Sequence, residues 1–305
     1  MFRKAKRTMA PIPCGKGPDG YRFLRSVAVF LAAGLAVGLA AFPTPAQSGS
    51  STGILGASAE EIMLLQSEMA DAEEHYIEGI RFLTGEIGGW PAAVARTGVG
   101  KVNAAMVTTL LIEHFQPGAV IMMGVAGGTN PDLLPGDMII AEQTAHHDLG
   151  SLTPQGLRHW GVRNPIDGSR NPVFFPGDSL LVLLVERASR GVEFEPIGTG
   201  EDERPPRVVR GVVVTGDVFV TFSSKRNQLR EDLQADAVEM EGAAVAQICW
   251  QRGVPCVIIR CLSDTADENA GGDYENFYQI AARNSARLVL DAVKLLASES
   301  ISASE

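Results

Sequence analysis

The stretch Ala237-Val-Glu-Met-Glu-Gly-Ala-Ala-Val-Ala-Gln247 joins a short strand-like run to an apolar run of helical composition. Two carboxylates, Glu239 and Glu241, fall at the junction. A strand that runs directly into a helix is a repeating unit of α/β proteins. Acidic side chains at the start of a helix either complement its dipole or take part in chemistry. The sequence on both sides of this stretch is needed to distinguish the two hypotheses.

Strand and helix patterns alternate along the chain on both sides of this stretch. Strands are predicted over Thr52–Gly56, Tyr76–Phe82, Ala92–Arg96, Ala119–Met123, Asp137–Thr144, Val208–Thr215, Ala235–Val238 and Val254–Leu262. Helices are predicted over Ala59–Met69, Lys101–Phe115, Ser179–Arg190, Ser223–Leu233, Gly242–Gly253 and Tyr274–Ala297. This alternation predicts a three-layer α/β/α fold, in which helices cover both faces of a mixed, mostly parallel central sheet.

Three segments do not fit the alternation. Residues 146–176 have little periodicity and are predicted to form a long loop or lid. Residues 191–207 are interpreted as a polar insertion. The Gly124–Gly128 segment is interpreted as a glycine-rich turn, where small residues let a flat ligand approach the backbone.

The first 46 residues have the layout of a secretory signal peptide. A basic lead precedes the apolar run Ser26–Phe42, and small residues suited to cleavage follow, ending at Ala46. An uncleaved membrane anchor is the alternative, although the run is short for a span. We therefore expect an exported, periplasmic protein with a single domain over residues 47–305.

Charge narrows the class of ligand. Without residues 1–46 the chain keeps 19 Lys and Arg against 35 Asp and Glu, a net charge of −16. Such a surface disfavours nucleic-acid backbones and anionic membranes. We therefore expect a small-molecule ligand, no nucleic acid, and no stable membrane partner once the leader is removed.

No metal or cofactor is predicted. The adjacent His146 and His147 point to opposite faces if they lie on a strand, and no spaced set of ligands accompanies them. The turn before Lys101 matches neither the dinucleotide-binding fingerprint nor the phosphate-binding P-loop.

Cys249 and Cys256 either pair in an oxidising compartment or remain buried thiols.

Chemistry-bearing residues gather where the predicted strands end. In an open α/β sheet, ligands bind at the carboxyl ends of the strands. Glu61, Phe219, Glu241 and Asp264 follow four different strands, and Arg260 lies inside one. A buried Arg needs a carboxylate or water partner, and crowded carboxyls shift one another's pKa and can divide acid and base roles. Each residue also has a structural interpretation, such as a helix-start acid for Glu61 or a core aromatic for Phe219.

Six collinear stretches between Thr52 and Leu296 carry a family resemblance. They are GILGASAEEI (53–62), TGVGKVNAA (97–105), GVAGG with a following GD (124–137), TGDVFV (215–220), VEMEGAAVA (238–246) and RCLSDTAD (260–267). The chain resembles the purine nucleoside phosphorylase/hydrolase superfamily, and within it the 5′-methylthioadenosine/S-adenosylhomocysteine nucleosidases. The resemblance implies hydrolysis of the N-glycosidic bond of an adenine nucleoside, with release of the base, by a homodimer.

The resemblance also implies roles for individual residues. Glu61 would activate water, Glu241 would bind the ribose hydroxyls, and Asp264 would protonate the purine. Phe219 and Val220 would bind the base, and Met240 would line the sugar. Arg260 would hold the carboxylates, and Glu239 would be structural. The remaining residues predicted to contact substrate are Ala126, Gly127 and Ser263.

Two other functions stay open. A phosphorylase of the same fold would need an anion pocket built from arginines and backbone amides. The loop from Gly56 to Glu61 has no Arg. A non-catalytic nucleoside-binding protein has no need of three costly carboxylates.

The chain departs from the family pattern at Ser58-Ala59, where family members usually have Met-Glu. We therefore expect the group at the 5′ end of the ligand to differ.

Overall fold

A computed structural model describes residues 51–197 and 204–302. These residues belong to one compact unit. The predicted signal peptide, residues 1–46, lies outside the described residues. Within the described residues, no helix is long and apolar enough to span a membrane.

An 11-stranded sheet runs through the centre of the described residues in the order β10-β7-β11-β12-β6-β13-β5-β1-β4-β3-β2. Its strands are β1 (Thr52–Gly56), β2 (Ala70–Ile77), β3 (Ile80–Ile87), β4 (Trp90–Arg96), β5 (Ala119–Met122), β6 (Val125–Gly128), β7 (Met138–His146), β10 (Phe174–Pro176), β11 (Val208–Thr215), β12 (Ala237–Glu239) and β13 (Cys256–Asp264). Strand β1 pairs in parallel with β4 and β5, whereas β3 pairs antiparallel with β4. The predicted mixed sheet is confirmed.

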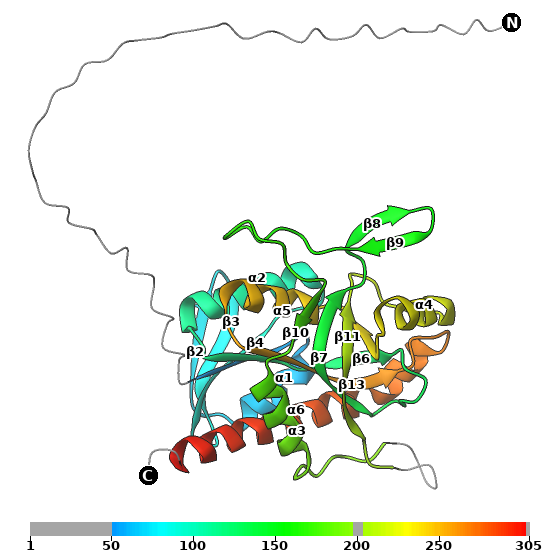
Figure 1. Cartoon of the computed structure of the whole chain (residues 1–305). Helices are drawn as coiled ribbons and strands as arrows, with labels where there is room; N and C mark the ends of the chain where they lie inside the picture. The colour runs from blue at the N-terminus through cyan, green and yellow to red at the C-terminus, as the bar shows by residue number, and fades with distance from the viewer. Residues whose placement is uncertain (1–50, 198–203, 303–305) are drawn as a thin grey trace, which may run out of the picture. The chain divides into compact units, whose positions relative to one another are not determined.

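Helices cover both faces of this sheet. They are α1 (Ala59–Ser67), α2 (Lys101–Phe115), α3 (Ser179–Ser189), α4 (Ser223–Leu233), α5 (Gly242–Arg252) and α6 (Ala270–Ser302). Helices α1, α3 and α6 lie together on one side, and α2 and α5 lie on the other (Figure 1). Side chains alternate along each strand, so Ile54 joins the apolar core under the first group and Leu55 joins the core under the second.

Three sequence predictions are wrong in detail. The strand expected over residues 76–82 is a hairpin, because Glu78 and Gly79 turn the chain between β2 and β3 with positive φ. The expected glycine-rich turn at residues 124–128 is largely strand β6. The expected loop over 146–176 contains the β8–β9 hairpin (Gly150–Thr153 and Gly156–His159) and strand β10. Strands β6, β8, β9 and β10 have only three or four residues each, too few to show a period of two, so the sequence pattern did not reveal them.

The polar insertion at 191–207 is fastened to the domain at two places. Glu195 forms ion pairs with Arg283 and Arg287 of α6, at 2.7 and 2.9 Å. Arg204 and Arg207 pair with the fully buried Asp137 just before β7, at 2.6 and 2.9 Å. The described parts of the insertion therefore belong to the folded body.

Candidate functional site

A cavity of about 350 Å³ opens at the ends of the central strands. This volume falls in the usual range for small-molecule sites. The cavity is lined by Ala57, Ser58, Glu61, Val99, Val125, Ala126, Gly127, Phe219, Val238, Glu239, Met240, Glu241, Ser263, Asp264, Tyr274 and Tyr278. Residues far apart in the sequence meet here because β12, β6 and β13 are neighbours in the sheet, and the Val125 N–H at the start of β6 donates to Glu61, which follows β1.

Glu61 is held by the start of helix α1. Ser58 caps this helix and forms a reciprocal capping box with Glu61. The Glu61 carboxylate accepts hydrogen bonds from the backbone N–H groups of Ala57 at 2.5 Å and Val125 at 3.3 Å. Burial raises the pKa of Glu61 above its ordinary value, although the Arg260 charge and these N–H groups oppose the shift. The carboxyl is thus both fixed in place and a stronger base than a solvated one.

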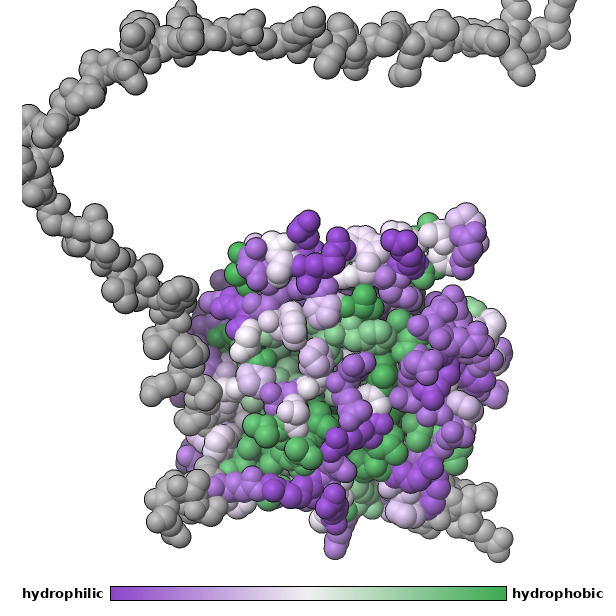
Figure 2. Space-filling model, viewed as in Figure 1, coloured by the Kyte–Doolittle hydropathy of each residue, from purple (hydrophilic) through white to green (hydrophobic). Residues whose placement is uncertain are grey.

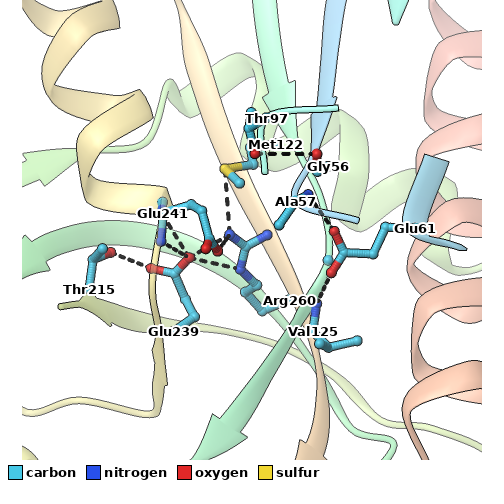
Figure 3. A network of polar contacts seen from close by, with 12 residues as sticks. Gly56, Ala57, Glu61, Thr97, Met122, Val125, Thr215, Glu239, Glu241 and Arg260 are labelled. Carbon is cyan, nitrogen blue, oxygen red and sulfur yellow. Dashed lines mark hydrogen bonds and ion pairs between the residues drawn. The ribbon is translucent and has the colours of Figure 1, made fainter. Parts of the chain in front are cut away.

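Arg260 lies behind the cavity and pairs chiefly with Glu239. Its guanidinium donates to a Glu239 oxygen at 2.5 Å and lies 3.7 Å from Glu241 (Figure 3). Glu239 also accepts hydrogen bonds from the Thr215 hydroxyl and from the N–H of Gly242. Burial would raise the pKa of Glu239, but the Arg260 charge and these hydrogen bonds lower it overall. Glu239 is therefore the carboxylate that balances the buried Arg.

Glu241 occupies the N-cap position of α5 and points toward the turn before α2. Its carboxylate accepts a hydrogen bond from the backbone N–H of Gly100 at 2.7 Å. Burial, followed by repulsion from Glu239, raises the pKa of Glu241 to about 7. The two acids of the opening stretch therefore differ in charge state. Glu239 is ionised and neutralised by Arg260, whereas Glu241 titrates near neutrality and faces the cavity.

Asp264 is the last residue of β13, where it is buried at the cavity wall. Its carboxylate accepts hydrogen bonds from the Ser263 hydroxyl and the Ala266 N–H, both at 2.8 Å. Burial raises the pKa of Asp264 despite these two bonds. A carboxyl with a raised pKa can keep a proton and transfer it to a bound ligand.

The structure brings most of the predicted site residues to this one cavity. Those that line it are Glu61, Ala126, Gly127, Phe219, Met240, Glu241, Ser263 and Asp264. Phe219 is half-exposed and meets Tyr274 edge-on at 5.9 Å between ring centroids, so it is not a core aromatic. Two predicted residues do not line the cavity. The Val220 side chain is buried in the apolar cluster under α4, and Arg260 lies behind the carboxylates.

Sequence reasoning missed part of the wall. Tyr274 and Tyr278 lie one turn apart on α6, with ring centroids 4.9 Å apart, and both line the cavity. Their spacing of four residues, close after the Ser263-Asp264 pair, is the signal that could have identified them. Val99 and Val125 complete the apolar part of the lining.

The cysteines and histidines of the described residues lie away from the cavity lining. Cys249, Cys256 and Cys261 are buried free thiols, and Cys249 is hydrogen-bonded to Cys256. His146 is hydrogen-bonded to Gln247 at 3.0 Å, and burial lowers the pKa of His147 to about 4. Across residues 51–197 and 204–302, no group of three or more His, Cys, Asp or Glu side chains could hold a metal ion.

The chain is similar in sequence to a known protein family and to proteins of known activity. The model of the family described as "Phosphorylase superfamily" matches residues 51–294. A 5′-methylthioadenosine/S-adenosylhomocysteine nucleosidase of Geobacillus kaustophilus is 38% identical over 244 residues, which cover 80% of this chain and 96% of that protein. A nucleosidase of the same name from Mycobacterium tuberculosis is 34% identical over 247 residues, covering 80% and 97%.

Solved structures agree with these sequence matches. The nucleosidase of Neisseria meningitidis in complex with methylthio-immucillin-A has a TM-score of 0.69 at 36% identity, covering 80% of this chain and 99% of that one. The futalosine hydrolase of Helicobacter pylori has a TM-score of 0.67 at 31% identity, covering 80% and 97%. The similarity spans both the fold and nearly the full length of each relative.

Proposed function

The chain belongs to the phosphorylase superfamily, and from that premise we propose that it is a nucleosidase that hydrolyses the N-glycosidic bond of adenine nucleosides of the 5′-methylthioadenosine/S-adenosylhomocysteine type and releases adenine. The observation that carries the proposal is the convergence of Glu61, Glu241 and Asp264 on one nucleoside-sized cavity. Burial raises the pKa of all three carboxyls.

Each carboxyl has a role that follows from its position. Cleavage of a glycosidic bond passes through an oxocarbenium-like state and needs an acid on the leaving group and an oriented water on the sugar. Asp264, with its raised pKa, protonates the departing purine. Glu61, fixed by the start of α1, accepts a proton from the attacking water. Glu241, held by the Gly100 N–H, binds the ribose hydroxyls.

Other residues bind and position the nucleoside. Phe219 stacks against the base, and the backbone of Val220 reads its polar edge. Ala126, Gly127 and Ser263 line the base end beside Asp264, and Met240 lies against the sugar. An added Cβ at Gly127 would lie 2.7 Å from an Asp264 oxygen, so a residue without a side chain is needed here. Arg260 is a positioning residue that holds Glu239 and, through it, the start of α5.

Hydrolysis is favoured over phosphorolysis by the charge of the cavity. No Lys or Arg is present among the described residues that line it, and Arg260 is paired with Glu239. A phosphate ion would therefore meet carboxylates with no cation to bind it. Water is the better acceptor of the ribosyl group.

Adenine release in the presence and absence of phosphate tests this proposal. We expect the mature protein to release adenine from 5′-methylthioadenosine in phosphate-free buffer, with formation of the free sugar. Asp264→Asn should lower kcat by roughly 10²–10⁴, the usual contribution of a general acid. Strict dependence on phosphate would contradict hydrolysis. Wild-type adenine release by Asp264→Asn would contradict the acid assignment.

We also propose that the protein is exported to the periplasm and works as a homodimer. The basic, apolar and small-residue order of residues 1–46 supports export. Val102 and Met106 of α2 support self-association, because both are apolar and exposed, with Val102 78% accessible. They follow Val99, which lines the cavity, so a second copy docked on α2 would lie beside the cavity opening.

A further inference from the structure

The cavity extends across the sheet from the end of β11 to the end of β1. Phe219 follows β11 and Ser58 follows β1, and strands β12, β6, β13 and β5 lie between these two in the sheet order. Under the proposed function, the base lies near Phe219 and Asp264, and the ribose lies near Glu241. The Ser58 end is therefore the part of the cavity that receives the C5′ substituent of the nucleoside.

A row of aromatic side chains connects the two ends. Phe219 contacts Tyr274, and Tyr274 contacts Tyr278 in the next turn of α6, at 5.9 and 4.9 Å between ring centroids. The Tyr278 hydroxyl is in turn hydrogen-bonded to the Ser58 hydroxyl and lies 3.4 Å from a Glu60 oxygen. Two hydroxyl groups therefore meet at the C5′ end of the cavity.

Counting donors and acceptors shows that this pair has capacity left for a ligand. The Ser58 oxygen already accepts from the backbone N–H of Glu61. If Tyr278 donates to Ser58, the Ser58 hydroxyl hydrogen remains free to donate. If Ser58 donates to Tyr278, and Tyr278 donates to Glu60, one acceptor position remains on each hydroxyl oxygen. The pair can thus present either a donor or an acceptor.

A ligand hydroxyl matches this pair better than a thioether does. A hydroxyl both donates and accepts, so it is satisfied in either arrangement. A thioether sulfur is a weak acceptor with no proton to donate. A thioether bound here would replace solvent without replacing the hydrogen bonds that solvent makes to the two hydroxyls. Near this end the cavity is also lined by Ala57, Val99 and Val125, which have no polar side chain, and by the Glu61 carboxylate, which accepts from the Ala57, Ser58 and Val125 N–H groups.

We propose that Ser58 and Tyr278 form a binding site for a hydroxyl group on C5′, so that the enzyme cleaves adenosine itself as well as 5′-thioether nucleosides. This inference rests on the proposed nucleosidase function. It adds a substrate class, adenine nucleosides with an unmodified 5′-hydroxyl, and it assigns the recognition of that hydroxyl to two side chains.

The comparison of adenosine with 5′-deoxyadenosine tests the inference, because the two differ only in the 5′-hydroxyl. We expect the wild-type kcat/KM for adenosine to exceed that for 5′-deoxyadenosine at least about tenfold, since a site that hydrogen-bonds a hydroxyl discriminates against its absence. In Tyr278→Phe and in Ser58→Ala, this ratio should fall to within about threefold of unity. Both substrates are measured on the same preparation, so loss of folded protein does not change the ratio.

Tyr76→Phe is the matched control, because Tyr76 is an exposed tyrosine on β2 whose hydroxyl is hydrogen-bonded to Glu74. Its ratio should equal that of wild type. A wild-type ratio near unity, or a ratio unchanged in Tyr278→Phe, would overturn the inference. Cleavage of 5′-methylthioadenosine is measured in parallel. If that nucleoside is cleaved while the ratio is near unity, only the inference fails. If no nucleoside releases adenine, the proposed function fails.

Discussion

At the scale of single residues, one buried Arg divides the roles of the surrounding carboxyls. Arg260 is 1% exposed and forms its close ion pair with Glu239, while Glu241 lies farther away at 3.7 Å. A single cation cannot neutralise every acid near it in a medium of low polarity. Glu241 and Glu61 consequently keep a raised pKa.

Replacement of Glu241 by Gln should show this division as a pH-dependent change in stability. The folded state raises the pKa of Glu241 from 4.5 to about 7, so it binds the proton more tightly than the unfolded chain does. The favourable contribution is complete below about pH 4.5 and is lost as the pH rises through 7. Glu241→Gln removes this loss. The free energy of unfolding of Glu241→Gln minus that of wild type should therefore increase by on the order of 1–3 kcal/mol between pH 4 and pH 8.

Glu239→Gln is the matched variant two residues away. It leaves Arg260 buried without its main partner, so we expect destabilisation of about 3–5 kcal/mol at pH 7. Denaturant unfolding at several pH values measures both variants. Equal responses of the two variants, or a Glu241→Gln curve parallel to wild type at every pH, would contradict the division of roles.

At the scale of secondary-structure elements, the junction between β5 and β6 positions side chains that belong to other elements. Gly124 lies at this junction, and an added Cβ would lie 2.7 Å from a Glu61 oxygen and 2.9 Å from an Arg260 nitrogen. The N–H of the next residue, Val125, donates to Glu61. The junction between β5 and β6 therefore holds the Glu61 carboxylate, at the start of α1, close to Arg260 in β13.

Gly124→Ala should impair catalysis although the residue is not in the cavity lining. The new methyl group must displace the Glu61 carboxylate, and a displacement of about 1 Å can cost on the order of 10²-fold in rate. We expect kcat/KM for adenine release to fall roughly 10–100-fold. Gly271→Ala in α6 is the control, because nothing lies within 4 Å of its added Cβ and Ala favours a helix. If both variants keep wild-type kcat/KM, the junction does not position Glu61.

At the scale of the whole molecule, two exposed apolar surfaces compete as sites of self-association. One is formed by Val102 and Met106 on α2, next to the cavity. The other lies on the face that carries α3, where apolar side chains gather in Figure 2 and Leu180 and Leu183 are exposed. Val99 of the cavity lining lies just before α2, so an interface on α2 would place the partner beside the cavity opening.

Val102→Glu should therefore weaken the proposed dimer. In a two-fold dimer the same surface meets itself, so the introduced charges come close together and repel. We expect protein from the periplasmic fraction to begin near Gln47 and to have the mass of two chains by light scattering. Val102→Glu should raise the dimer Kd at least tenfold, whereas Leu180→Glu should leave it unchanged. A dimer Kd raised by Leu180→Glu and unchanged by Val102→Glu would place the interface on α3. Export is contradicted by a separate outcome, namely a protein that keeps residues 1–46 and stays in the membrane fraction.

Much of the architecture followed from the sequence because its signals are local. The bounds of α2, α4 and β11 agree with the predicted ranges, since turn residues and apolar runs mark their ends. The resemblance also identified Glu61, Glu241 and Asp264, which the structure brings to one cavity. Each of these acids lies at or just after the end of a strand, and this position can be predicted once the alternation of strands and helices is known.

Other features depended on contacts between distant segments. Only the tertiary structure decided that Arg260 pairs with Glu239 rather than Glu241, that β6 belongs to the sheet, and that Tyr274 and Tyr278 reach the cavity beside Ser58. The physical reason is that a local sequence pattern determines how the chain bends and which face is apolar. The charge state and partners of a buried side chain depend instead on groups up to 220 positions away in the chain, as with Ser58 and Tyr278.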